Sequence, residues 1–253
     1  MLPTFPGSVR VEMIDADELC VVWLEETAEG VGDNREYEEI AEVTWDEVAA
    51  AIPAERELLA IASEATDGED FDRRADDAID ERYSGDRYTP DGTEVDEGPL
   101  TRFQDLDLGV MSAVAALVAA GALTTTSCRG HQANRGEPRP LIRFVCDEVR
   151  LPWISSAAAE AGCGLLLDPH GMLQLYASDV GAFVSFASRL LARRDTFAGL
   201  SMEDLFESRD AYGQYVDDWE ATHESTYFSR RDLDLMRRAM PSVRPTKGQD
   251  QLF

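Results

Sequence analysis

The residues Leu123-Thr-Thr-Thr-Ser-Cys-Arg-Gly-His131 mark the point where a helix, a strand and a loop are expected to follow one another. The alanine-rich segment before them, from about Leu106 to Ala120, predicts a helix that ends at Gly121. The three threonines predict a strand, because β-branched side chains favour extended backbone. A thiol, a guanidinium and an imidazole then follow at the strand end, a common place for functional groups in α/β proteins.

Strand and helix patterns alternate beyond this loop. Apolar runs predict strands at 141–146, 164–167 and 172–176 and helices at 152–161 and 179–194. Pro152 is expected near the start of the first helix, Gly162 at its end, and residues 168–171 form a turn between two strands. The predicted fold class is α+β: an α/β sandwich whose helices cover one face of a mainly antiparallel sheet.

Four segments are predicted along the chain. Residues 1–65 form a small acidic ββα module, with strands at 9–14 and 19–24 and a helix opened by the capping box Thr44-Trp-Asp-Glu47. Residues 66–100 form an acidic, partly disordered linker in which 71–83 are compatible with a polar helix. Residues 101–196 form the sandwich with the Cys128–His131 loop, and 197–253 add a tail and two docking helices, at 201–220 and 229–239.

Charge divides the chain unevenly. The net charge is −27, and residues 1–105 hold 31 of the 50 acidic residues but only 8 of the 23 basic ones. This excess repels phosphate, so a nucleotide or RNA is expected to bind only through residues 101–253. The acidic surface has two interpretations: an adaptation for solubility, which we favour, or a face of residues 1–100 that binds a basic protein.

Export and membrane insertion are not indicated. The N-terminus lacks the basic start and apolar core of a signal peptide, and the apolar run at 110–123 is short for a membrane span. The cysteines, Cys20, Cys128, Cys146 and Cys163, are too scattered for a disulfide framework. We therefore predict a cytoplasmic protein without membrane contact.

The Cys128–His131 loop is compatible with three kinds of chemistry. A metal site formed with Cys146, Cys163 and His170 is disfavoured, because only one closely spaced ligand pair is present. Covalent catalysis would use Cys128 as nucleophile and His131 as its base. Anion binding would use the basic residues that follow, since arginine holds phosphate through paired hydrogen bonds. The candidate ligand-binding residues are Ser127, Arg129, Gly130, Arg135, Arg139 and Arg143, with Arg150 nearby.

These arginines have a simpler interpretation as well: on an acidic protein they pair with carboxylates. Glycine loops of the GxxxxGKS or GxGxxG type are absent from the sequence. The residues identify no cofactor, and whether the protein is an enzyme stays open.

The segment Thr124-Thr-Thr-Ser-Cys-Arg-Gly130, after its predicted helix, resembles the Thr-Thr-Ser-Ser-Cys-Ser-Gly-Arg motif of the wybutosine-synthesising tRNA methyltransferase family. The resemblance is confined to this loop, and Arg129 stands where the family has a small residue. It implies S-adenosylmethionine as cofactor and a guanosine-derived base of tRNA as substrate. The site that it implies consists of Ser127, Cys128, Gly130 and His131. The loop equally resembles uncharacterised bacterial and phage proteins with a Cys-x-Gly-His loop, which imply no activity.

The leading functional prediction is that the Cys128–His131 loop binds a phosphate-bearing ligand, either a nucleotide or RNA; whether the loop also modifies that ligand stays open. The alternative is a non-enzymatic interaction protein whose residues 1–100 bind a basic protein. The two predictions differ in the expected position of the arginines: they are either gathered around a ligand site or paired with carboxylates of the same protein.

Overall fold

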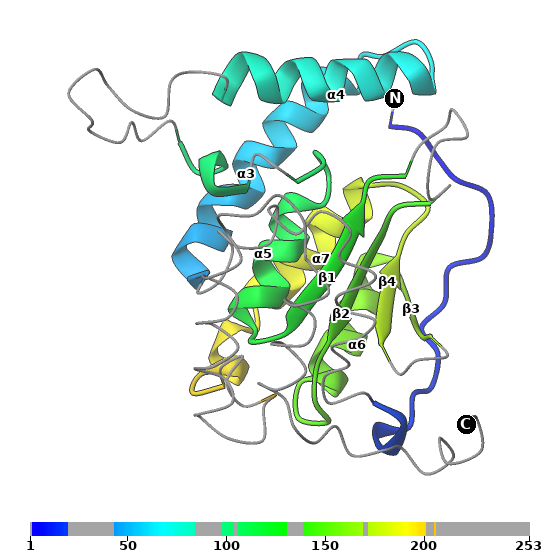
Figure 1. Cartoon of the computed structure of the whole chain (residues 1–253), viewed down its shortest axis with the longest axis vertical. Coiled ribbons are helices and arrows are strands. Elements are labelled where there is room, and N and C mark those ends of the chain that lie inside the picture. The colour runs from blue at the N-terminus through cyan, green and yellow to red at the C-terminus, as the bar shows by residue number, and fades with distance from the viewer. Residues whose placement is uncertain are drawn as a thin grey trace, which may run out of the picture.

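The computed structural model describes residues 2–19, 43–83, 98–103, 106–130, 139–168, 172–200 and Leu205. These residues form five α-helices and one four-stranded antiparallel sheet, which confirms the predicted α+β class (Figure 1). No helix among them is both long and apolar enough to cross a membrane.

The sheet has the spatial order β1-β2-β4-β3, and every neighbouring pair is antiparallel. Its strands are β1 (Leu123–Cys128), β2 (Leu141–Val145), β3 (Gly164–Leu167) and β4 (Leu173–Tyr176). The strands predicted after residue 122 are thus present, each within one residue of its expected start and end where a range was given. The register between β1 and β2 shifts between Thr124 and Thr126.

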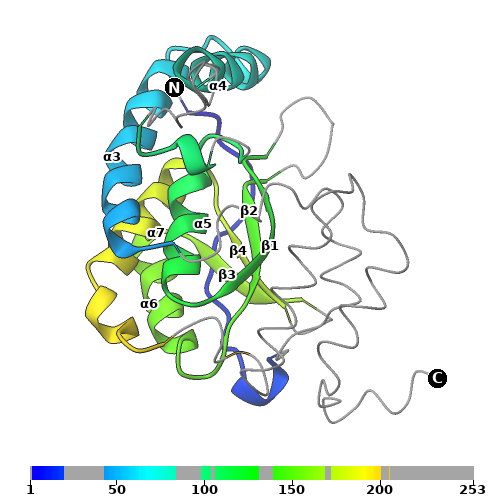
Figure 2. The ribbon, with the colours of Figure 1, turned by 60° about the vertical axis from the view of Figure 1, so that its left-hand side comes forward.

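Helices cover one face of this sheet, as the sequence predicted (Figure 2). They are α5 (Met111–Ala119), α6 (Leu151–Ala161) and α7 (Gly181–Leu191), with α3 (Trp45–Ala62) packed against α5 and α7. α4 (Gly68–Tyr83) lies across one end of α3 (Figure 1). Short 3₁₀ turns occupy Ala16–Glu18, Thr101–Phe103 and Arg194–Phe197.

The strands separate apolar from mixed side chains because successive residues point to opposite faces. Ile142 and Phe144 of β2, with Leu175 of β4, are fully buried in the core beneath the helices. The alternate positions, which include Arg143 and Gln174, lie on the face turned away from α5, α6 and α7, called the second face below. This face carries Arg143 of β2 and also Arg139, which precedes the strand. Both were predicted from the sequence as ligand-binding residues.

Two local predictions are met closely. Thr44 and Glu47 form the predicted capping box: the Thr44 hydroxyl accepts a hydrogen bond from Glu47 N at 3.2 Å, and Thr44 N donates to Glu47 Oε2 at 2.7 Å. α6 has Pro152 in its first turn and ends at Gly162, whose φ of +75° is the left-handed conformation that favours glycine.

The N-terminal segments differ in part from their predicted arrangement. Within the predicted linker, Gly68–Tyr83 form α4, which buries Phe71, Ala75 and Ala78 in the common core. Apolar residues at i, i+4 and i+7 along an otherwise charged sequence are enough to dock a helix. In the predicted hairpin, Val11 makes a parallel bridge to Leu165 of β3, and residues 20–24 lie outside the described residues. The predicted helices at 201–220 and 229–239 also lie outside them, apart from Leu205.

The helix predicted from Leu106 begins only at Met111, because a buried carboxylate fixes its first turn. Glu55 of α3 accepts hydrogen bonds from Gly109 N at 2.8 Å, Met111 N at 2.9 Å and Ser112 N at 2.9 Å, and from the Ser112 hydroxyl. Gly109 has a φ of +105°, which turns the chain into the helix. Burial raises the pKa of the Glu55 carboxyl, and these hydrogen bonds oppose that rise.

A buried arginine caps the opposite end of α5. The Arg150 Nε donates to the carbonyl oxygen of Ala120 at 2.9 Å, and its guanidinium also pairs with Asp147. Negative charge at the start of a helix and positive charge at its end both complement the helix dipole. Both termini of this fully enclosed helix are therefore capped by side chains from outside it.

Replacing Glu55 by alanine is expected to lower the free energy of unfolding by about 3 kcal/mol or more, because buried donors lose their acceptor. Glu55→Gln keeps one acceptor oxygen and should cost less. Glu57→Ala, on the exposed side of the same helix, is the matched control and should cost about 0.5 kcal/mol or less. Urea unfolding followed by circular dichroism measures all three; equal losses for Glu55→Ala and Glu57→Ala would contradict the capping role.

Candidate functional site

The predicted loop begins at the end of β1, where Cys128 lies opposite Leu141 of β2. Tyr176 of β4 and Gly164 of β3 continue the same row across the sheet. Gly130 N donates to Cys128 Sγ at 3.3 Å. Gly130 has a φ of +76°, and a Cβ there would lie 2.8 Å from the Arg139–Pro140 backbone. The loop therefore turns tightly around the thiol and requires glycine two residues after it.

The Arg129 side chain, predicted to bind a ligand, is instead enclosed by carboxylates. Its side chain is 4% exposed, with nitrogens 3.3 Å from Asp72, 2.8 Å from Asp76 and 3.6 Å from Asp107. Burial lowers the pKa of Arg129, and the three carboxylates outweigh this effect, so the pKa is raised overall. Arg129 joins α4 to the end of β1, as the carboxylate-pairing interpretation expects.

The other arginines of the predicted anion site are placed differently. The Arg139 guanidinium lies over the Tyr176 ring, 5.5 Å from its centre. Arg150 is fully buried at the C-terminal end of α5, as described above. Arg135 and His131 lie outside the described residues, so the pairing of Cys128 with His131 stays a prediction. The described arginines of the predicted basic cluster are therefore dispersed over both faces of the sheet.

Arg143 differs from these residues in its surroundings. It lies on the second face in the middle of β2, opposite Thr126 of β1 and Gln174 of β4. Its Nε atom is buried and has no hydrogen-bond partner in the part of the chain that the structure describes. No described carboxylate forms an ion pair with it either. Arg143 as a whole is half-buried. A buried donor without an acceptor is costly, so this position is suited to an anion that binds the guanidinium from outside.

The sequence also indicated that Arg143 and Gln174 are unusual positions within their strands. Leu-Ile-Arg-Phe-Val and Leu-Gln-Leu-Tyr each place one long polar side chain in an apolar strand. Arg143 and Gln174 are directly paired in the sheet. Gln174, Thr126 and Tyr176 were not predicted as site residues, because the strand order was not known from the sequence.

The described cysteines do not gather into one site. Cys146 follows the far end of β2, about 17 Å along the strand from the row of Cys128, and Cys163 is about three strand spacings, roughly 14 Å, away. Burial raises the pKa of the Cys146 thiol and raises that of Cys163 to about 12. Among the described residues, no three His, Cys, Asp or Glu side chains are arranged to hold a metal ion.

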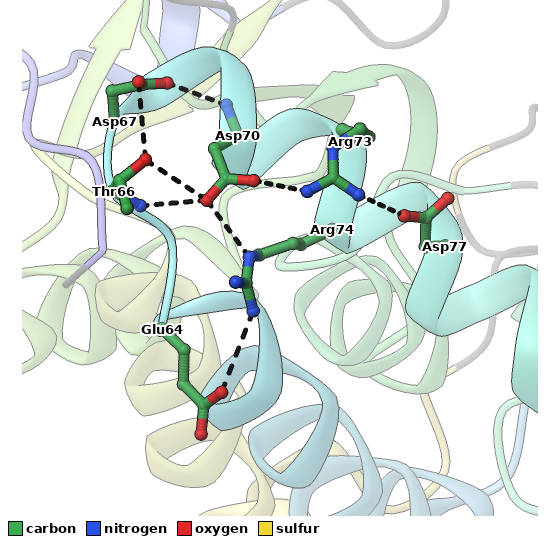
Figure 3. Close-up of polar contacts among 7 residues, drawn as sticks. All are labelled: Glu64, Thr66, Asp67, Asp70, Arg73, Arg74 and Asp77. Carbon is green, nitrogen blue, oxygen red and sulfur yellow. Dashed lines mark hydrogen bonds and ion pairs between the residues drawn. The ribbon is translucent and has the colours of Figure 1, made fainter.

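Much of the acidic charge on α4 is used in local contacts. Asp70 lies at the centre of a network at the α3–α4 corner, where it accepts from Thr66 N at 2.9 Å and pairs with Arg73 and Arg74 (Figure 3). The hydrogen bond from Thr66 and the two guanidinium groups lower the pKa of Asp70 to about 2. Asp70 therefore helps to fix the start of α4, while Asp72 and Asp76 of the same helix hold Arg129.

Comparison of the whole chain with protein-family models, curated proteins and solved structures gives no match. The resemblance of the Cys128 loop to the wybutosine-synthesising methyltransferases therefore stays a prediction.

Replacing Arg129 by alanine is expected to lower the free energy of unfolding by about 2–4 kcal/mol, because three carboxylates lose their shared counter-charge. Arg189→Ala is the matched control, since this arginine is exposed on α7 and should cost about 0.5 kcal/mol or less. Chemical unfolding measures both. A loss for Arg129→Ala no larger than that of the control would show that Arg129 does not anchor α4.

Of the three described thiols, Cys128 is expected to react fastest with iodoacetamide in the native protein at about pH 8, because the thiolate is the reactive form. Cys146 and Cys163 are buried and have raised pKa values, so they present little thiolate. The experiment uses a Cys20→Ser background and mass spectrometry of the labelled peptides. Faster labelling of Cys146 or Cys163 than of Cys128 would overturn this order.

Proposed function

We propose that this protein binds a phosphate-bearing ligand, a nucleotide or RNA, on the second face of the sheet, with Arg143 contacting a phosphate. The observation that carries the proposal is the buried Arg143 Nε without a partner among the described residues. The guanidinium offers several donors in a fixed planar arrangement that matches phosphate oxygens. A bound phosphate would supply both the missing acceptor and the missing negative charge.

The surroundings of Arg143 support a ligand of this kind. Gln174 lies beside it in the sheet and offers an amide donor and acceptor. Arg139 precedes β2 by two positions and shares the parity of Arg143, so both belong to the second face, about 13 Å apart along the chain. Two cations at this separation suit a ligand with more than one phosphate group, such as a nucleotide or a short stretch of RNA backbone.

Arg129 has a structural role in this proposal and the Cys128 loop forms one border of the site. Cys128 shares its end of the sheet with Tyr176, over which Arg139 lies. A reaction at the thiol would need a base, and the predicted base, His131, lies outside the described residues. The proposal is therefore one of binding.

Binding of a basic protein by residues 1–100 has less support. Asp70, Asp72 and Asp76 of α4 pair with arginines of this same chain. Part of the acidic charge thus has a role in folding that requires no partner, although exposed carboxylates remain on α3 and α4.

Arg143→Ala is expected to weaken binding of ATP and of a short single-stranded RNA about 10-fold or more, because it removes a charge-assisted contact. Isothermal titration calorimetry of the full chain at low salt measures the affinity. Arg189→Ala, an exposed arginine on the helix side, should leave it unchanged. Affinity should fall as salt rises, since phosphate binding releases counterions.

Two outcomes would contradict the proposal. The first is no binding of ATP, inorganic phosphate or RNA at low salt by the unaltered chain. The second is binding of S-adenosylmethionine, which has no phosphate, in the absence of phosphate-dependent binding. That result would favour the activity implied by the methyltransferase resemblance.

A further inference from the structure

Residues 2–12, called the N-terminal strap below, run from the Cys128 end of the sheet along the edge of β3 (Figure 1, blue). The strap is attached firmly at one end. Glu12 N donates to Leu165 O at 2.8 Å, and Leu165 N donates to Arg10 O at 3.0 Å. The Tyr176 hydroxyl adds a hydrogen bond to Arg10 O at 3.2 Å. Residues 10–12 thus extend the sheet by one short parallel segment.

The first part of the strap, residues 2–7, is attached by fewer contacts. Phe5 N donates to Ser178 O at 2.8 Å, and Phe5 is the buried side chain of this part. Thr4, Pro6 and Gly7 around it are exposed. Displacing residues 2–7 therefore breaks one described backbone hydrogen bond, exposes the Phe5 ring and lifts the half-buried Leu2 side chain off the core. Residues 10–12 stay paired with β3 in this movement.

Phe5 packs against the turn that holds the thiol. A Cβ placed on Gly130 would lie 2.9 Å from Phe5 Cζ, so the ring closes directly over this glycine. Gly130 N in turn donates to Cys128 Sγ. The ring and the thiol therefore meet at the same residue from two sides.

The strap also contacts an arginine of the second face. A Cβ placed on Gly7 would lie 3.2 Å from Arg139 Nη1, which puts the strap backbone against the guanidinium. On its other side Arg139 lies over Tyr176, the residue whose hydroxyl bonds to Arg10. In this arrangement the Arg139 guanidinium is held between the strap backbone and the Tyr176 ring.

We propose that residues 2–7 form a displaceable cover over the Cys128 end of the ligand site, hinged at residues 10–12. Displacement exposes the Cys128 thiol and frees Arg139 to contact a second phosphate of the ligand. The release of Arg139 to contact a phosphate rests on the proposed function. Exposure of the Cys128 thiol does not, since it requires no ligand.

The test measures the rate of Cys128 alkylation by iodoacetamide in the full chain with Cys20→Ser. Phe5→Ala removes the ring that holds the cover closed, so the rate should rise about 10-fold or more. Met13→Ala, a fully exposed apolar residue beyond the hinge, is the matched control and should not change the rate. Equal rates for Phe5→Ala and the unaltered sequence would overturn the proposal.

Hydrogen exchange in the unaltered chain provides a second measurement that does not depend on a variant. The Phe5 amide should exchange faster than the Glu12 amide, because residues 2–7 open while residues 10–12 stay bound. Equal or slower exchange at Phe5 would contradict a hinge at residues 10–12.

Titration with ATP separates this inference from the proposed function. ATP should bind Phe5→Ala more tightly than the unaltered chain, since the cover no longer competes. If no form binds ATP but Phe5→Ala still accelerates alkylation, the phosphate site fails and the cover over the thiol stands. If ATP binds through Arg143 and Phe5→Ala changes neither rate nor affinity, the cover fails and the site stands.

Discussion

The contact on which the rest of the structure depends is the buried Glu55 carboxylate at the start of α5. This helix is enclosed by α3, α7 and the sheet, so water cannot satisfy the free N–H groups of its first turn. Glu55 accepts hydrogen bonds from two of these groups, Met111 N and Ser112 N, and also from Gly109 N just before the helix and from the Ser112 hydroxyl. Because Glu55 belongs to α3, the same contact fixes the N-terminal helix against the core of the sandwich.

Charged side chains perform a similar task elsewhere in this acidic protein. Arg150 donates a hydrogen bond to the carbonyl oxygen of Ala120 at the end of α5 and pairs with Asp147. Arg129 holds the acidic face of α4 against the end of β1. A net charge of −27 opposes compaction, and each arginine enclosed by carboxylates relieves part of that repulsion. Arg129 and Arg150, which pair with carboxylates, therefore belong to the fold, whereas Arg143 has a buried Nε with no hydrogen-bond partner among the described residues.

The alternation of side chains along β2 explains why Arg143 lies on the second face and not in the core. β2 contributes its apolar side chains to the core beneath the helices and its arginine to the other face. The N-terminal strap borders the same face at its Cys128 end, where Phe5, Gly130 and Arg139 meet. The Cys128 thiol, Phe5 of the proposed cover and Arg139 of the proposed ligand site thus lie together because three chain segments, distant in sequence, converge at this end of the sheet.

Sequence patterns by themselves determined the four strands of the sheet, the end of α6 at Gly162 and the capping box at Thr44, because these depend on neighbours a few residues away. They also indicated the α+β class and the one-sided helical layer. The roles of Glu55, Arg129 and Arg143 were decided only by the tertiary structure. Glu55 meets its partners across more than fifty residues, and Arg129 meets Asp72 across a similar separation. The residues next to an arginine in the sequence do not show whether carboxylates will enclose its side chain. The fold decides this, because it brings distant segments together around the arginine.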